Sequence, residues 1–186
     1  MSCDISRGRL EPCKDSLGGL DAVYFINDAD LAYTDLTFDL TNTDAIESVA
    51  NSPMAYKYDL KGNSSFEQTI VSSRDTGTTY FEQVLNLTLK KQDVTTHKEI
   101  KLLAYGNPKV IVRDNNGNFF LAGAKFGMDV TGGTVTSGAA MGDLNGYTLV
   151  LTGMEPAPAF FFEATTEAGL VSAGIDITDG NGTILS

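Results

Sequence analysis

A mainly β fold is predicted for this sequence: an antiparallel β-sandwich or barrel with one short α-helix at about 93–105 and with extended arms and loops. Apolar and polar residues alternate with a period of two along 80–91, as they do in a half-buried strand. Asn116-Gly117 separates two short apolar runs, and Asn-Gly is a strong signal for a tight hairpin. One segment alone has the spacing of an amphipathic helix.

Length and composition favour one globular domain. The chain has 186 residues, of which 42% are hydrophobic and 20% are charged, so it can bury a full core. We expect a single β-sandwich domain over 1–186, with an N-terminal arm at about 1–20 and a C-terminal segment at about 176–186. No run of about 18 apolar residues occurs, and "MSCDISRGRL" lacks the apolar stretch of a secretory signal, so a protein made and kept in the cytosol is expected.

The first strands are expected at 21–26 and 54–60. "DAVYFI" is a compact apolar run, and "MAYKYDL" alternates tyrosines with charged or polar residues. The preceding segment "EPCKDSLGGL" (11–20) contains Gly18 and Gly19, which allow the chain to turn sharply into the first strand. We interpret this segment as the anchoring corner of the arm.

A long antiparallel hairpin is predicted from 64–72 and 79–90. One face of its second strand is apolar and is interrupted only by Gln83; it carries Phe81, Leu85, Leu87 and Leu89. The opposite face is polar and carries Glu82, Asn86, Thr88 and Lys90. This pattern predicts a strand with one face toward the core and one toward solvent.

The predicted helix follows the hairpin directly. Thr95 or Thr96 is expected as its N-cap, with Glu99 three residues after Thr96 to complete a capping box. The apolar stripe of the helix consists of Ile100, Leu103 and Ala104, and the helix is expected to end at Gly106-Asn107-Pro108.

Strands resume after the helix. "KVIVRD" and "NFFLAG" flank the Asn-Gly turn as a second hairpin, whereas "GMDVTGGTVTSGAAMGDLNG" (127–146) is interpreted as a long stretch of small residues. Further strands are expected at 147–158 and within "FFFEATTEAGLVSAGIDI", and "TDGNGTILS" closes with a turn and a final strand. Phe160 to Phe162 would place rings on both faces of their strand, so we expect cover on both sides, either by the helix or by a neighbouring subunit.

The charge balance argues against one class of partner. Thirteen basic and 24 acidic residues give a net charge of −11, the opposite of what a phosphate-neutralising surface needs. Stable binding to DNA is therefore not expected. Two interpretations remain: the charge keeps a concentrated protein soluble, or it lines a surface past which DNA slides without sticking.

The residues with catalytic potential form no recognisable constellation. Cys3 and Cys13 are the only cysteines, and reduced structural thiols are favoured over a small disulfide loop or a catalytic thiol. His97 is expected in the first turn of the helix as a solvated residue. It lies far from both cysteines in sequence, so a zinc site is not predicted.

The remaining motifs are better explained by turns. "DITDGNGT" (176–183) lacks the residue order of an EF-hand loop and suits a tight β-turn. The glycine pairs lack the flanking residues of phosphate-binding loops. Glu82 and Asp143 cannot be assigned as a glycosidase pair, because their separation is unknown. We predict no catalytic, cofactor-binding or metal-binding residue and no enzymatic activity.

Several segments carry a resemblance to a known family. The opening "GRLEPCKDSLGGLDAVYF" and the later "NPKVIVRDNNGNFFLAG" and "GMDVTGGTVTSGAAMGDLNGYTLVLTGMEPAPA" resemble virion proteins of phages that infect Bacteroidetes-type hosts. The most distinctive segment is "GDLNGYTL" (142–149), followed by Glu155-Pro156. The overall plan is similar to that of the major tail tube proteins of long-tailed bacteriophages.

The resemblance implies an assembly role. In that family six subunits form a ring, and rings stack into a hollow tube through which DNA passes. It implies a homo-oligomer in the virion tail, assembled in the host bacterial cytoplasm, that contacts other tail proteins, binds no membrane and lets DNA pass without specific binding. Open strand edges would pair across the ring, and the hairpin 64–90 and the stretch 127–146 would reach the next ring.

Specific residues follow from this expectation. The candidate assembly residues are Cys13, Gly18, Gly19, Phe66, Phe81, Asp143 and Tyr147. The candidate lumen carboxylates are Glu67, Asp75 and Glu82.

Three other functions remain open at the level of sequence. The first is another virion β-sandwich protein, such as a tube terminator, connector or capsid decoration. The second is a carbohydrate-binding module that uses Tyr105, Tyr147 and the turn at 176–181. The third is a hydrolase built on Cys13 and His97.

Overall fold

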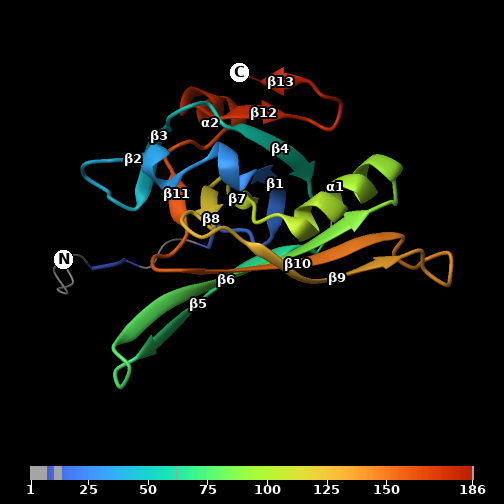
Figure 1. The fold of residues 1–186 in the computed structure, drawn as a ribbon, viewed down its shortest axis with the longest axis horizontal. Coiled ribbons are helices and arrows are strands. Elements are labelled where there is room, and N and C mark those ends of the chain that lie inside the picture. Colours follow the sequence, from blue (N-terminus) through green and yellow to red (C-terminus); the bar gives the residue numbers. More distant parts are fainter. Residues whose placement is uncertain (1–7, 11–13, 62, 186) are drawn as a thin grey trace.

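The computed structural model describes residues 8–10, 14–61 and 63–185, and it confirms the predicted mainly β fold. Two sheets pack face to face, the larger one above the smaller one in Figure 1. The large sheet contains β1 (Leu20–Ile26), β2 (Leu36–Phe38), β3 (Ala45–Val49), β4 (Met54–Asp59), β7 (Lys109–Asp114), β8 (Phe119–Ala122), β11 (Phe160–Phe162), β12 (Asp176–Thr178) and β13 (Ile184–Leu185). The small sheet contains β5 (Ser65–Ser73), β6 (Thr78–Lys90), β9 (Asp129–Thr136) and β10 (Gly146–Glu155).

Short helical elements complete the fold. These are α1 (Val94–Tyr105), α2 (Glu167–Ser172) and the 3-10 turns η1 (Asp28–Asp30) and η2 (Tyr33–Asp35). In Figure 1, α1 lies at one end of the sandwich and α2 lies over the large sheet, on the side away from the small sheet.

The large sheet is nine-stranded, in the order β13-β12-β4-β1-β7-β8-β11-β3-β2. It is mixed and not wholly antiparallel as predicted, because β11 pairs with β3 and β12 pairs with β4 in parallel. Both parallel partners come from distant parts of the chain, as parallel pairing requires a long connection. Such pairings leave no local sequence signal.

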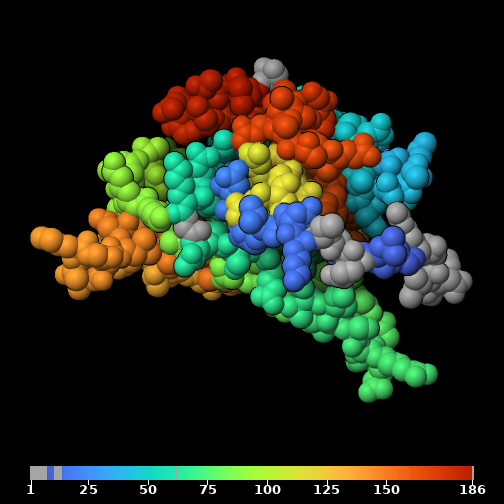
Figure 2. Space-filling model, turned by 180° about the vertical axis from the view of Figure 1, so that it is seen from behind, coloured from blue at the N-terminus to red at the C-terminus, as the bar shows by residue number. Residues whose placement is uncertain are grey.

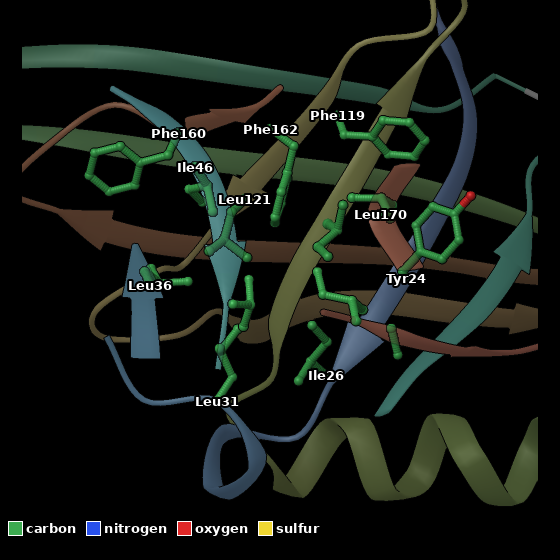
Figure 3. Packing of buried hydrophobic residues seen from close by; sticks show 14 of the residues in the cluster. Tyr24, Ile26, Leu31, Leu36, Ile46, Phe119, Leu121, Phe160, Phe162 and Leu170 are labelled. Atoms are coloured by element: carbon green, nitrogen blue, oxygen red, sulfur yellow. The ribbon is translucent and has the colours of Figure 1, made fainter. Parts of the chain in front are cut away.

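The central strand β1 is buried on both faces. Tyr24 and Ile26 belong to a cluster on one side of the large sheet, which Figure 3 shows from close by. Val23 and Phe25 point the other way and belong to the cluster between the two sheets. Because successive strand residues alternate between faces, β1 joins the two cores.

The first core shows that the large sheet curls. Leu36 of β2 and Ile46 of β3, near one end of the sheet, lie in the same cluster as Ile177 of β12, near the other end. Leu170 of α2 packs into this cluster and is fully buried. The sheet therefore bends around its own core, with α2 as a cover.

The second core lies between the two sheets, and the hairpin predicted from the sequence forms part of its wall. β5 pairs with β6 from Ser65↔Asn86 to Ser73↔Thr78, and the buried face of β6 includes Leu85 and Leu87. Gln83, which interrupts the apolar face, is also buried, and its Oε1 accepts a hydrogen bond from the backbone N–H of Gly123 at 2.9 Å. The buried amide thus has a partner.

Helix α1 matches the predicted range, but its N-cap is different. The Asp93 side chain caps the helix by accepting a hydrogen bond from the backbone N–H of Thr95 at 3.1 Å. The predicted caps Thr95 and Thr96 lie inside the first turn. Ile100 is buried as expected, whereas Ala104 is exposed.

Two further predictions were wrong. Residues 127–146, interpreted as a stretch of small residues, contain the eight-residue strand β9, whose Gly133 lies so close to the backbone of Thr148 that a side chain there would clash. The segment 160–177 contains the short helix α2, capped by the Thr166 side chain, in addition to strand. Phe161 packs against Phe120 with ring centroids 4.6 Å apart and is 48% exposed, so cover of this side of β11 by a neighbouring subunit stays a prediction.

An ionic network fixes α2 to the large sheet. The Glu167 carboxylate accepts a hydrogen bond from the Tyr24 hydroxyl at 2.8 Å and pairs with Lys57 Nζ at 2.7 Å and with Arg113 at 3.8 Å. Partial burial alone would raise the pKa of Glu167, but the hydrogen bonds from Lys57 and Tyr24 and the neighbouring cations outweigh it and lower the pKa. Burial and the Glu167 charge raise the pKa of Tyr24.

The lowered pKa of Glu167 predicts a loss of stability in acid. The ionised carboxylate stabilises the fold above its ordinary pKa of 4.5, and this contribution is lost as the pH falls through the lowered pKa of the folded state. Glu167→Gln should cost about 1 kcal/mol at pH 7 and should flatten the acid limb of the stability curve. Urea denaturation from pH 7 to pH 3 measures this, with the exposed Glu163→Gln as control. Superimposable acid limbs for wild type and Glu167→Gln would contradict it.

Candidate assembly interface

The small sheet has two open edges. Its order is β5-β6-β10-β9, and all three pairings are antiparallel. Within the described chain no strand pairs with the outer side of β5 or of β9. Neither edge strand contains Lys or Pro, the residues that commonly prevent edge-to-edge association. Four alternating strands also make β5 and β9 run in opposite directions.

One face of the small sheet is uncovered. The described chain places no element against it, and Figure 1 shows it at the lower boundary of the molecule. The register puts Glu67, Glu82 and Asp129 on this face, because each pairs with a residue whose side chain points away from the core. In the pairing register Val84 and Thr152 lie between Glu67 and Asp129, and Met154 pairs with Glu82 and is 60% exposed. The face also carries Lys90 and, farther from the acidic residues, the Thr134 and Thr148 hydroxyls, which lie 2.7 Å apart.

The three predicted lumen carboxylates therefore do not all lie on the uncovered face. Glu67 and Glu82 share the uncovered face, whereas Asp75 lies in the turn that joins β5 to β6. Sequence reasoning missed Asp129, because 127–146 was interpreted without a strand. The β-branched residues of "DVTGGTVT" were the available signal.

Projections extend from opposite ends of the small sheet. The β5–β6 hairpin runs beyond the body at one end, and the loop at 137–145 extends at the other (Figure 1). Figure 2 shows both projections from behind, the hairpin in green and the loop in orange. Ile70, paired with Phe81 near the hairpin end, is 67% exposed, and Met141 in the loop is fully exposed.

The four candidate assembly residues of the small sheet lie in different environments. Phe66 packs against the core between the sheets, and Phe81 is half-buried opposite Ile70. Tyr147 is 1% exposed, so its ring is a core residue and offers no surface to a neighbour. Asp143 is exposed but closes its own loop by accepting hydrogen bonds from the N–H groups of residues 139 and 140 at 2.9 and 2.8 Å; these bonds lower its pKa.

The arm enters the sheet at a fixed corner. The Asn116 side chain bonds both the N–H and the carbonyl oxygen of Leu17, each at 2.8 Å, and Asn115 Nδ2 donates to the Gly18 carbonyl at 2.6 Å. Gly19 has a φ of +97°, which confirms that the chain needs a glycine to turn into β1. Cys13 lies outside the described residues.

Two adjoining hollows lie between this corner and β5. Each has a volume of about 380 Å³ and opens to solvent. The first is bounded mainly by polar groups, including Asn63, Ser64 and Asn115. The second is more apolar, with walls from Leu17, Leu20, Phe66 and Phe120.

Among the described residues there is no group of three His, Cys, Asp or Glu side chains that could hold a metal ion. His97 is exposed on α1, as expected. Asp179 accepts hydrogen bonds from the N–H groups of Asn181 and Thr183 at 2.9 and 2.8 Å, so residues 179–183 form a tight turn between β12 and β13. Within the described chain no helix has the length and apolar character needed to span a membrane.

Comparisons with protein-family models, with curated proteins and with solved structures give no significant match to this chain.

The arm corner provides a stability prediction. Gly19→Val should lower the free energy of unfolding by about 1–3 kcal/mol, because a β-branched residue is strained at positive φ and its Cβ would lie 2.9 Å from Asn115 Nδ2. Gly18→Val is the matched control, since no atom lies within 4 Å of a Cβ there. Equal urea midpoints for the two variants would refute this account of the corner.

Proposed function

We propose that this protein is a phage virion structural protein, the tail tube subunit that assembles into stacked, hexameric rings around a DNA-conducting channel. The observation that carries the proposal is the small sheet, whose two open edges run in opposite directions and whose outer face is uncovered. This geometry supports a subunit that is completed by copies of itself.

The strand directions suit ring closure. Rotation of a copy about a ring axis keeps the direction of any strand that runs along that axis. With the strands along the axis, β9 of one copy would therefore lie beside β5 of the next in antiparallel orientation. The same rotation keeps the uncovered face toward the axis in every copy. A head-to-tail contact of this kind closes into a ring when the rotation angle divides the circle.

The chemistry of the uncovered face suits passage of DNA. Glu67, Glu82 and Asp129 would face the channel, and the net charge of −11 adds to the repulsion of phosphates. Lys90 and the exposed Met154 share this face, so the proposed repulsion of phosphates depends on the excess of carboxylates over Lys90. The proposed wall guides DNA without specific binding, cofactor or catalytic step.

The two projections suit contacts along the tube. The hairpin and the 137–145 loop lie at opposite ends of the sheet, so each ring would present hairpins on one side and loops on the other. Such a contact repeats without closing and generates a filament. Other tail proteins would meet the two ends of the tube in the virion, which is assembled in the bacterial cytoplasm.

The proposal predicts particles visible by electron microscopy. Purified protein at high concentration should form rings or tubes with a central hole. Light scattering should give a particle mass that is a multiple of the mass of one chain. The edges provide the driving force, because unpaired strand groups gain partners on assembly. A strictly monomeric compact particle across the accessible concentration range would overturn the proposal.

The acidic face leads to a prediction about how strongly assembled tubes retain DNA. Neutralisation of Glu67, Glu82 and Asp129 to Gln, Gln and Asn should leave tubes intact and should increase retention of linear DNA on them at low salt, because phosphate repulsion is reduced. The matched control neutralises three exposed carboxylates elsewhere, at Asp15, Glu47 and Glu163. Equal DNA retention by the two triple variants would contradict the assigned orientation of the face.

A further inference from the structure

The core between the sheets is incomplete beside β5. The second hollow lies there, and its apolar walls are continuous with that core through Leu20 and Phe66. Phe66 and Phe120 meet across it with ring centroids 6.4 Å apart, and both remain only half-buried. A hollow of about 380 Å³ bordered by half-buried rings is a place where apolar side chains of a partner gain burial.

The opposite edge of the same sheet carries side chains that could fill the hollow. The β9 register places Val130 opposite Leu151 and Val135 opposite Tyr147, and both partners are buried. Since paired strand residues point to the same face, both valines lie on the core side of the sheet. Val130 packs against its own core, whereas Val135 remains 54% exposed.

We propose that the hollow beside β5 is the receptor for β9 of a second copy and that Val135 of that copy packs against Phe66 and Phe120. This inference rests on the proposed ring, in which β9 lies antiparallel to β5. Antiparallel addition with the uncovered faces aligned puts Val135 on the same side of the joint sheet as Phe66. The second copy thus contributes part of the apolar core as well as backbone hydrogen bonds.

The corner of the arm belongs to the same receptor. Leu17 and Gly19 form its far wall, and the Asn115 and Asn116 hydrogen bonds to Leu17 and Gly18 fasten that wall to the turn between β7 and β8. The receptor is therefore preformed in the single chain, which limits the ordering cost of association. The corner would therefore have a role in assembly through this wall.

Substitution of Val135 tests the inference directly. Val135→Asp should reduce the fraction of protein in rings at least tenfold at a concentration where wild type is assembled, because a carboxylate would enter an apolar hollow. Thr134→Asp is the matched control: it lies one residue away on the uncovered face and should assemble normally. Circular dichroism and thermal melting identify folded monomers, and Val135→Thr keeps the test valid if the aspartate variant does not fold.

A second variant blocks the other half of the contact. Leu17 lines the receptor and is 65% exposed, so Leu17→Trp should fill part of the receptor without disturbing the core. Leu17→Trp keeps β9 intact, and Val135→Asp keeps the receptor intact. Each variant alone should stay monomeric, and an equimolar mixture should form a one-to-one dimer by light scattering.

The outcomes separate the inference from the function on which it rests. Wild-type rings together with normal rings from Val135→Asp would overturn the inference and leave the tail tube proposal intact. A mixture that stays monomeric while wild type assembles would also overturn it. Wild-type protein that never assembles would overturn both.

Discussion

The structure depends on the burial of β1 from both sides. Tyr24 and Ile26, on one face of the strand, are buried in the core under α2. Val23 and Phe25, on the other face, are buried in the core between the two sheets. A sheet that is covered on both faces must be the middle layer of the molecule. The small sheet is then an outer layer, with one face on the core and one face that no described element covers.

This layering explains why the small sheet suits contact with copies and the large sheet does not. The large sheet curls around its own core, and its end strands β2 and β13 have only three and two residues, a length that discourages pairing. The edges of the small sheet have nine and eight residues. In the proposed ring, the acidic face, the open edges and the hollow beside β5 are consequences of one arrangement.

Local sequence patterns predicted much of the fold, whereas the strand pairings between distant parts of the chain could not be predicted from them. The β5–β6 hairpin, α1 and the β7–β8 hairpin follow from alternation, helical spacing and the Asn-Gly turn. β9 was missed because Gly132 and Gly133 interrupt its alternation of apolar and polar residues. α2 was missed because a helix of six residues is too short to show a clear helical spacing of apolar residues. The parallel pairing of β11 with β3 joins residues more than a hundred positions apart, which no local pattern encodes. At the candidate interface, the alternation along 80–91 predicted that Glu82 lies on the polar face, but the burial of Tyr147 depends on tertiary packing.

The even strand number of the small sheet has a consequence for symmetry. With four alternating strands, addition of another copy restores the starting polarity, so strand direction places no limit on how many copies can join. Subunit number would instead be decided by the angle between neighbours, which side-chain size at the joint controls. A change of a few atoms where two subunits meet could thus alter the diameter of the central channel, while the fold of each subunit stays the same.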